Sequence, residues 1–233
     1  FIKRYCNNKL AVIGFFTLVL ITLIVIIAPP FLPFSEAEID PLAFNMPPSA
    51  KHLLGGDDVG RDVLSRLLYG GRVSLAVGIF STAVSVIVGI PLGMLAAFYR
   101  GAFEVVVMRL SDIFMSFPST ILILFLVSMF GPSIITVTVV IGVLGWPKFA
   151  RQIYGSVLSI REKDYIEGAV AIGAKDKLII TRYILPNAVA PIFISITFRI
   201  ASAIILESSL SFLGMGVQPP AASWGNMLYN AQS

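Results

Sequence analysis

The sequence predicts an all-α fold, a polytopic transmembrane helical bundle, on three observations. Apolar residues make up 57% of the 233-residue chain and charged residues only 13%, whereas a soluble domain carries about 25% charged residues. Five apolar stretches each reach about 20 residues, the length of helix that crosses about 30 Å of hydrocarbon. The surplus of basic over acidic residues lies in the segments between those stretches. No basic face with interleaved aromatic residues is present, which argues against nucleic-acid binding.

The five predicted spans are residues 10–32, 73–98, 105–129, 134–146 (continuing helically towards Arg151) and 191–213. The first follows Lys3, Arg4 and Lys9, as a signal peptide also would. Its apolar run is too long for a signal peptide, however, and prolines rather than small residues follow it. We therefore interpret it as a retained membrane anchor.

The second span places Ser81, Ser85, Gly89 and Gly93 at intervals of four residues. This spacing aligns small residues on one helix face and favours close helix packing in lipid. The alternative to simple packing is that this helix moves or lines a transport pathway.

Two prolines lie inside predicted spans. Pro91 is in the second span and Pro118 is in the third. Each removes a backbone hydrogen bond, so we expect a kink at both positions.

The distribution of Lys and Arg predicts the orientation. A basic start places the N-terminus in the cytoplasm, and residues 33–72, with six acidic and four basic residues, then lie outside. The long basic interval 148–188, with seven basic and four acidic residues, falls inside after the fourth span. Every short basic segment lands on the inner side, as the positive-inside rule requires.

Charged residues inside the spans have a structural and a functional interpretation. Asp112 follows Arg109 by three residues, which favours a modest ion pair near the inner interface. Arg199 and Glu207 share the fifth span, where a charge usually faces a bundle interior or a water path. Satisfied contacts between helices and a direct contact with substrate both remain open for these residues.

A short surface helix is predicted in the external segment. Asp57 and Asp58 are placed to cap a helix that starts near residue 59. Leu64, Leu67 and Leu68 then form an apolar stripe that lies on the membrane surface or against a partner.

Catalytic and metal-binding patterns are absent from the sequence. Cys6 and His52 are the single cysteine and the single histidine, so no Cys/His metal cluster and no plausible catalytic triad is predicted. No phosphate-binding loop of the Walker type occurs either. We therefore expect no catalytic residue, metal or cofactor on this chain, and any energy source to be another chain.

The basic interval 148–188 predicts a projecting knuckle. It reads as two short helices that break at Gly173 and stop before Pro186, with Ile166, Ala169 and Val170 as an apolar face. Its pattern resembles the EAA loop of ABC-importer permeases. The residues that carry this resemblance, and that it assigns to contact with the ATPases, are Glu167, Gly168, Ala169, Gly173, Leu185 and Pro186. Gly168 stands where the family has alanine, and Tyr183 where it has isoleucine.

Further motifs extend the resemblance over nearly the whole chain. Residues 54–63 (LGGDDVGRDV), 69–75 (YGGRVSL), 145–147 (GWP) and 209–218 (SLSFLGMGVQ) resemble the second permease subunit of dipeptide, oligopeptide and nickel ABC importers. The resemblance implies a type I ABC-importer permease in a bacterial or archaeal cell membrane. It also implies a homologous permease partner, two cytoplasmic ATPases that bind ATP and magnesium, and an extracytoplasmic substrate-binding protein.

The expected organisation is a tail and first span (1–32), an extracytoplasmic segment (33–72) and a permease core (73–233) that includes the coupling loop. Family members carry a sixth span after a segment like Ser223-Trp224-Gly225, so we expect a piece whose last span is missing, or a natural five-span variant. A receptor or scaffold without transport, or a channel, is the alternative function. Peptides, nickel chelates, opines and glutathione all remain open as solutes.

Overall fold

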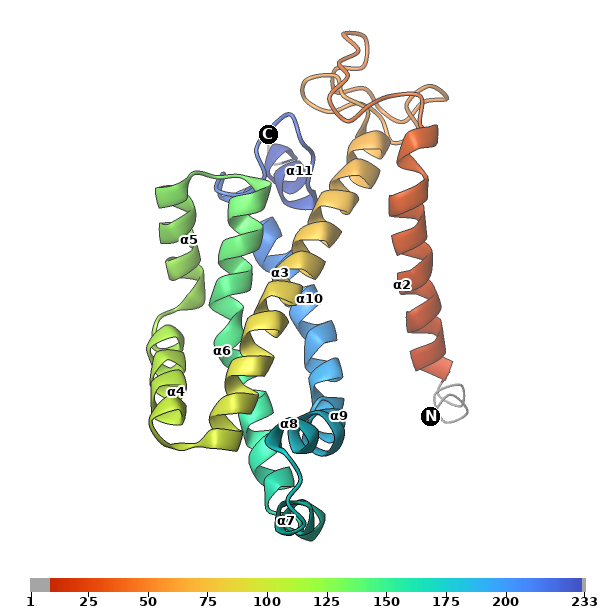
Figure 1. Ribbon diagram of the computed structural model, residues 1–233. Coiled ribbons are helices and arrows are strands. Elements are labelled where there is room, and N and C mark those ends of the chain that lie inside the picture. Colours follow the sequence, from red (N-terminus) through yellow and green to blue (C-terminus); the bar gives the residue numbers. More distant parts are fainter. Residues whose placement is uncertain (1–8, 232–233) are drawn as a thin grey trace. The chain divides into compact units, whose positions relative to one another are not determined.

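The computed structural model describes residues 9–231, and this part of the chain is all-α (Figure 1). Within it, backbone pairing between extended residues is limited to two isolated bridges, Ile39 with Arg61 and Gly56 with Asp62. The chain forms two compact units, one from residues up to 75 together with those from 211, the other from residues 76–210. The predicted fold class is confirmed. Lys3, Arg4 and Cys6, on which the sequence interpretation drew, lie outside the described residues.

The first unit begins with α2, Lys9–Ile27, and the short helix η1, Pro29–Phe31. Val25 is the buried residue of α2, and its other apolar side chains are largely exposed, as expected of a helix whose neighbour is lipid. Near its end α2 is fixed to the first turns of α3, Val63–Tyr99. There Arg72 Nε donates to the Val25 carbonyl at 3.1 Å. The unit ends with α11, Trp224–Asn230.

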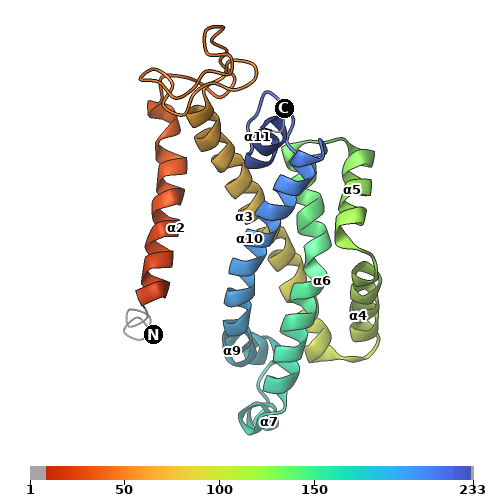
Figure 2. The ribbon, with the colours of Figure 1, turned by 180° about the vertical axis from the view of Figure 1, so that it is seen from behind.

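The second unit contains most of the remaining helices, and α3 and α10 connect it to the first. Along the chain they are α4 (Gly101–Ser116), α5 (Ser119–Phe130), α6 (Ile134–Arg161), α7 (Asp164–Ala171), α8 (Asp176–Leu178), the π-helical segment η2 (Ile179–Ile184), α9 (Leu185–Ala188) and α10 (Ala190–Phe212). Figures 1 and 2 show α4 and α5 alongside α6. Because α6 contacts helices from both ends of the unit, most of its residues are at least partly buried.

Four helices, α2, α3, α6 and α10, are each long and apolar enough to cross a membrane. The predicted third span is not one straight helix, because α4 and α5 meet at an angle of 88°. Pro118 causes the break: the residue before a proline avoids helical geometry, and Phe117 is extended with φ −92° and ψ 141°. Pro91, by contrast, lies inside α3, which continues through it as a helix.

The predicted short surface helix does not exist as a separate element. Residues 63–69 are instead the first turns of α3, which runs without interruption to Tyr99. Its capping residue is Asp62 rather than Asp57 or Asp58, because the Asp62 Oδ2 accepts from the Ser65 N–H at 2.8 Å. Asp57 Oδ1 accepts from the backbone N–H of Val59 and Arg61 and so closes a turn before the helix.

The small residues of α3 form its contact with α6, as predicted from their spacing. A Cβ atom on Gly89 would lie 2.6 Å from the carbonyl oxygen of Trp146, and one on Gly93 would lie 2.1 Å from that of Ala150. Ser85 Oγ donates to the Gly142 carbonyl at 2.7 Å. Glycine and serine therefore let the two backbones approach within a distance that larger residues would prevent.

Candidate functional site

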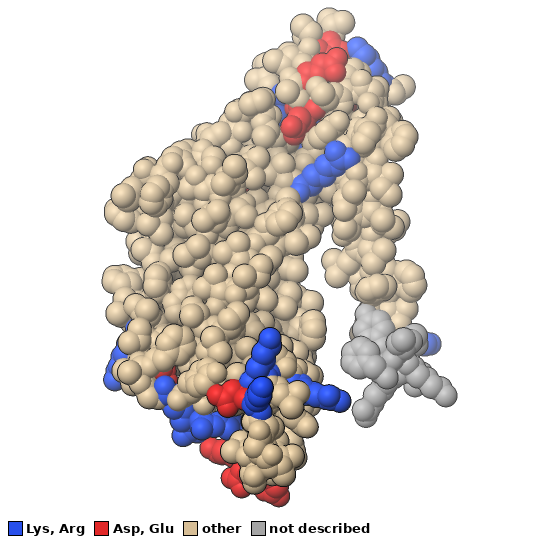
Figure 3. Space-filling model, in the orientation of Figure 1, with Lys and Arg blue, Asp and Glu red and all other residues tan. Residues whose placement is uncertain are grey.

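The knuckle, defined here as residues 164–188, comprises α7, α8, η2 and α9 and lies at the end of α6 (Figure 2). Charged side chains gather at this end of the second unit, whereas the face of that unit shown in Figure 3 is otherwise largely uncharged. This distribution is the one expected of a segment in water joined to helices in lipid. The knuckle was predicted from the sequence, and its helix–turn–helix form is confirmed.

Gly173 forms the turn between the two halves of the knuckle. Its φ is +80°, a value at which a residue with a side chain is strained. The Gly173 N–H donates to the Val170 carbonyl at 2.9 Å, and the Ala174 N–H donates to the Ala169 carbonyl at 3.0 Å. These two bonds form a Schellman motif, which satisfies the last carbonyls of α7 and fixes the direction of the chain after it.

The apolar face of α7 divides into a buried part and an exposed part. Ile166 and Ala169 pack into a core that includes Ile153 of α6 and Ile184 of η2. Val170, predicted on the same face, is instead 58% exposed, because it lies one position beyond Ala169 around the helix. Glu167 and Gly168 are also exposed.

The second half of the knuckle runs as continuous helical structure through Pro186, so the predicted stop before that proline is wrong. Pro186 lies in the first turn of α9, and as a proline it donates no backbone hydrogen bond to the preceding turn. The π-helical segment η2 directly precedes this helix. Leu185 is half-buried and Pro186 is exposed.

Contacts with the end of α3 anchor the base of the knuckle. Arg161 Nη1 donates to the Ala97 carbonyl at 3.4 Å, and its guanidinium lies 6.0 Å from the ring centre of Phe98. Arg100 Nη2 lies 3.9 Å from Glu162 Oε1. A groove of about 470 Å³ opens beside these contacts, lined by Arg100, Arg161, Glu162, Ile166, Glu167, Val170 and Ala171.

The basic interval is shorter as a loop than the predicted range 148–188. α6 continues to Arg161, so Lys148 and Arg151 are helical residues and not part of the loop. Arg151 forms an ion pair with Asp112 of α4, and Arg109 Nη1 also lies 3.8 Å from that carboxylate. Asp112 therefore forms the ion pair with Arg109 that its spacing predicts. Its second partner, Arg151 of α6, is not indicated by sequence spacing.

Arg199 and Glu207 of α10 are both turned to the interior of the protein. Arg199 Nη2 donates to the Ile141 carbonyl of α6 at 2.7 Å. Glu207 is fully buried and has a polar contact of its own. The predicted contact between helices is confirmed for Arg199.

A cluster of charges lies in residues 33–62. His52 is buried, with Nδ1 2.9 Å from Asp62 Oδ1 and Nε2 3.4 Å from Asp40 Oδ2, and its ring stacks on Phe34. Lys51 Nζ donates to Asp40 Oδ2 at 2.5 Å. This hydrogen bond from Lys51 lowers the pKa of Asp40 to about 2, so Asp40 remains ionised at neutral and mildly acidic pH.

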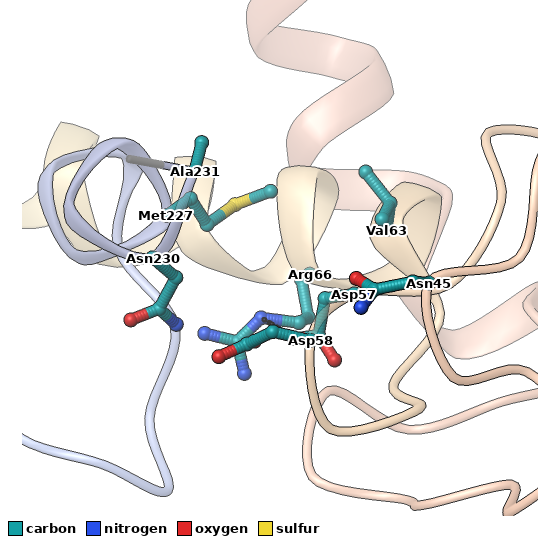
Figure 4. A pocket seen from close by; sticks show the side chains of 8 residues that line it. All are labelled: Asn45, Asp57, Asp58, Val63, Arg66, Met227, Asn230 and Ala231. Atoms are coloured by element: carbon teal, nitrogen blue, oxygen red, sulfur yellow. Dashed lines mark ion pairs between the residues drawn. The ribbon is translucent and has the colours of Figure 1, made fainter. Parts of the chain in front are cut away.

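Asp57 connects the external loop with α3 and forms part of a pocket in the first unit. Arg61 Nε donates to Asp57 Oδ2 at 2.7 Å, and Arg66 Nε lies 3.5 Å from the same oxygen. Arg66 also reaches Asn226 of α11. The pocket, of about 300 Å³, is lined by Asn45, Asp57, Asp58, Val63, Arg66, Met227, Asn230 and Ala231 (Figure 4).

Chemically, these sites offer contact, charge pairing and hydrogen bonding. Within residues 9–231, His, Cys, Asp and Glu side chains form no group of three that could hold a metal ion. The ion pair of Arg151 with Asp112 and the hydrogen bond between Arg66 and Asn226 were not predicted from the sequence. Both depend on helices that are distant along the chain, and a single sequence carries no signal of such pairings.

Comparison with known proteins places the chain in a family. Residues 89–232 match the family model described as binding-protein-dependent transport system inner membrane component. Residues 1–48 match that of the N-terminal TM domain of oligopeptide transport permease C.

Individual relatives agree with these matches. The dipeptide transport system permease protein DppC of Alkalihalophilus pseudofirmus is 38% identical over 99% of this chain and 76% of its own length. The glutathione transport system permease protein GsiD of Pectobacterium atrosepticum is 40% identical over 100% of this chain and 78% of its own.

A solved structure shares the fold. The MetNI methionine ABC transporter in inward-facing conformations matches with a TM-score of 0.60 at 22% identity, over 72% of this chain and 80% of the matched chain. Together with the knuckle and the apolar helices, the sequence matches settle the family. The chain belongs to the binding-protein-dependent transport system inner membrane components.

Proposed function

We propose that this chain is a permease subunit of an ATP-driven importer that moves di- or oligopeptides, or related small solutes, into the cytoplasm. The named relatives support this solute class, because they are called dipeptide and glutathione permeases. The assignment of nickel chelates as possible solutes rests on the sequence resemblance alone.

The observation that carries the proposal is the surface of the knuckle. Val170 is 58% exposed and Ile172 is 85% exposed, although the segment around them is charged. Apolar side chains held at a rigid turn outside the apolar helices suit contact with a soluble protein. Glu167 lies in the adjoining groove.

The partners follow from this assignment. Two cytoplasmic ATP-binding subunits would contribute ATP and magnesium, and one of them would hold the knuckle through Glu167, Gly168, Ala169, Gly173, Leu185 and Pro186. A homologous permease would complete the pathway, and an extracytoplasmic binding protein would deliver the solute. The chain would cross a bacterial or archaeal cell membrane with its N-terminus in the cytoplasm.

Reversing the charge of Glu167 tests the proposal. Glu167→Lys is expected to release the ATP-binding subunits or to separate ATP hydrolysis from uptake, while the permease still inserts. Glu38→Lys, a charge reversal at an exposed residue of the external segment, is the control and should leave co-purification normal. Full retention of the ATP-binding subunits together with normal peptide uptake in Glu167→Lys would refute the coupling role.

A further inference from the structure

A pocket of about 340 Å³ lies between α6 and α10, two of the helices that are long and apolar enough to cross a membrane. Its wall combines two cations with hydroxyl, amide and aromatic groups. The lining residues are Lys148, Phe149, Gln152, Ser195, Phe198, Arg199 and Ser202.

The two cations of this pocket lack a negative partner. Neither Lys148 nor Arg199 forms an ion pair with a carboxylate of the described residues, although Asp112 of α4 and Glu162, which follows α6, do pair with other arginines. An uncompensated pair of positive charges in a partly buried wall attracts an anion.

Arg199 is held in place yet incompletely satisfied. Its Nη2 donates to the Ile141 carbonyl, and Gly145 makes room for it, since a Cβ atom there would lie 2.4 Å from Nη2. Its Nε, in contrast, is enclosed and has no hydrogen-bond partner among the described residues. A buried donor without an acceptor marks a place where an acceptor is missing.

The depth of the pocket favours a transported solute over a lipid headgroup. Arg199 is nine residues beyond the start of α10, or about 14 Å along its axis, and Lys148 is fourteen residues beyond the start of α6, or about 21 Å. Both residues therefore lie within helices that are long and apolar enough to cross a membrane, and not at the ends of those helices. Lipid phosphates, by contrast, lie at the surface of the hydrocarbon layer. Charges at such depth usually face a water-filled path.

We propose that this pocket binds the terminal carboxylate of the solute during its passage, with Lys148 and Arg199 providing the charge. Ser195 adds a hydroxyl donor, and the exposed Phe198 packs on the apolar part of the solute. The inference rests on the proposed function, because that function supplies a solute with a free carboxylate.

Charge-selective labelling of the assembled complex tests the pocket. In a Cys6→Ser background, Ser195→Cys should react about tenfold faster with a negatively charged thiosulfonate than with a positively charged one. Adding Lys148→Gln should bring the ratio close to one, and Lys148→Arg should preserve it. Thr197→Cys, an exposed position of α10 outside the pocket, is the control and should show no preference.

Protection then identifies the ligand. Dialanine, but not dialanine amide, should slow the labelling of Ser195→Cys. Equal rates with both reagents, no labelling, or equal protection by the two peptides would overturn the proposal. Slower labelling of Ser195→Cys in phosphatidylglycerol nanodiscs than in phosphatidylcholine nanodiscs would assign the pocket to a lipid headgroup instead. Failure of the wild-type complex to import dialanine would contradict dipeptide transport in the proposed function, independently of the charge preference.

Discussion

At Gly173 the effect of backbone conformation can be tested apart from the effect of side-chain size. The φ angle of this residue is positive, while the space around it is open. A Cβ atom at this position would meet nothing within 4 Å. Gly173→Val should therefore cost about 1–3 kcal/mol through backbone strain alone and impair coupling. Gly173→Asn should cost less, because asparagine tolerates the left-handed region. Uptake and co-purification of the ATP-binding subunits measure the difference.

Two results would contradict this account of Gly173. If asparagine and valine were equally harmful, the partner surface rather than the backbone would require glycine. If Gly168→Ala, also in open space but without positive φ, were as damaging as Gly173→Val, the turn would have no special role.

The buried carboxylate of Asp62 makes two contacts: it caps α3 and it pairs with His52. Asp62→Ala should destabilise the external segment by about 2–4 kcal/mol, the sum of a lost cap and a buried ring left unpaired. Hydrogen exchange at the first amides of α3 and limited proteolysis of residues 33–62 measure this loss.

Asp58→Ala is the matched control for Asp62→Ala. The Asp58 side chain is 41% exposed and lies 3.7 Å from Arg61, so its removal should change stability by less than about 0.5 kcal/mol. Equal protection from exchange in wild type and Asp62→Ala would show that the cap contributes nothing.

At the scale of elements, apolar length predicts most helices well, and the failures have identifiable causes. The four long spans and the position of the knuckle follow from hydropathy and charge. The start of α3 is misplaced because Arg61, Arg66 and Arg72 are polar, although their partners allow them to lie in or beside a helix. The helix α6 also ends later than predicted, at Arg161 instead of near Arg151.

The site residues were less predictable than the helices. Gly173 is predictable because a backbone turn with positive φ favours glycine, and a glycine is visible in the sequence at a single position. Arg199 is predictable only as a charge in an apolar span, since its acceptor, Ile141, lies on a different helix. A contact of that kind is set by packing, which one sequence does not reveal.

The α3–α6 contact gives a prediction of its own. Gly93→Leu would place a side chain where even a Cβ atom lies 2.1 Å from the Ala150 carbonyl. We expect a loss of stability above about 3 kcal/mol, because both the backbone and a well-packed core would have to move. The thermal stability and yield of the purified complex measure it.

Gly155→Leu on α6 is the control, because a Cβ atom there has nothing within 4 Å. It should leave the melting temperature nearly unchanged. A Gly93→Leu complex as stable as wild type would mean that α3 and α6 are not packed as described.

At the scale of the whole molecule, the number of crossings decides whether α4 and α5 form a broken span or a re-entrant loop. The bent pair has enough length and apolar character for either. Between the external segment and the knuckle the chain passes through α3, this pair and α6. Three crossings would put Leu42 and Ile172 on opposite sides of the membrane, and two would put them on the same side.

Charge favours three crossings. Residues 33–72 carry six acidic and four basic residues, whereas the interval 148–188, which includes the knuckle, carries seven basic and four acidic residues and should be cytoplasmic. In a Cys6→Ser background, Leu42→Cys should therefore react with an impermeant thiol reagent in intact cells. Ile172→Cys should react only after permeabilisation. Both side chains are more than 80% exposed, at 86% and 85%, so burial would not explain a failure to react. Labelling of both variants in intact cells would place the knuckle outside, make α4 and α5 a re-entrant loop, and remove the basis for contact with cytoplasmic ATPases.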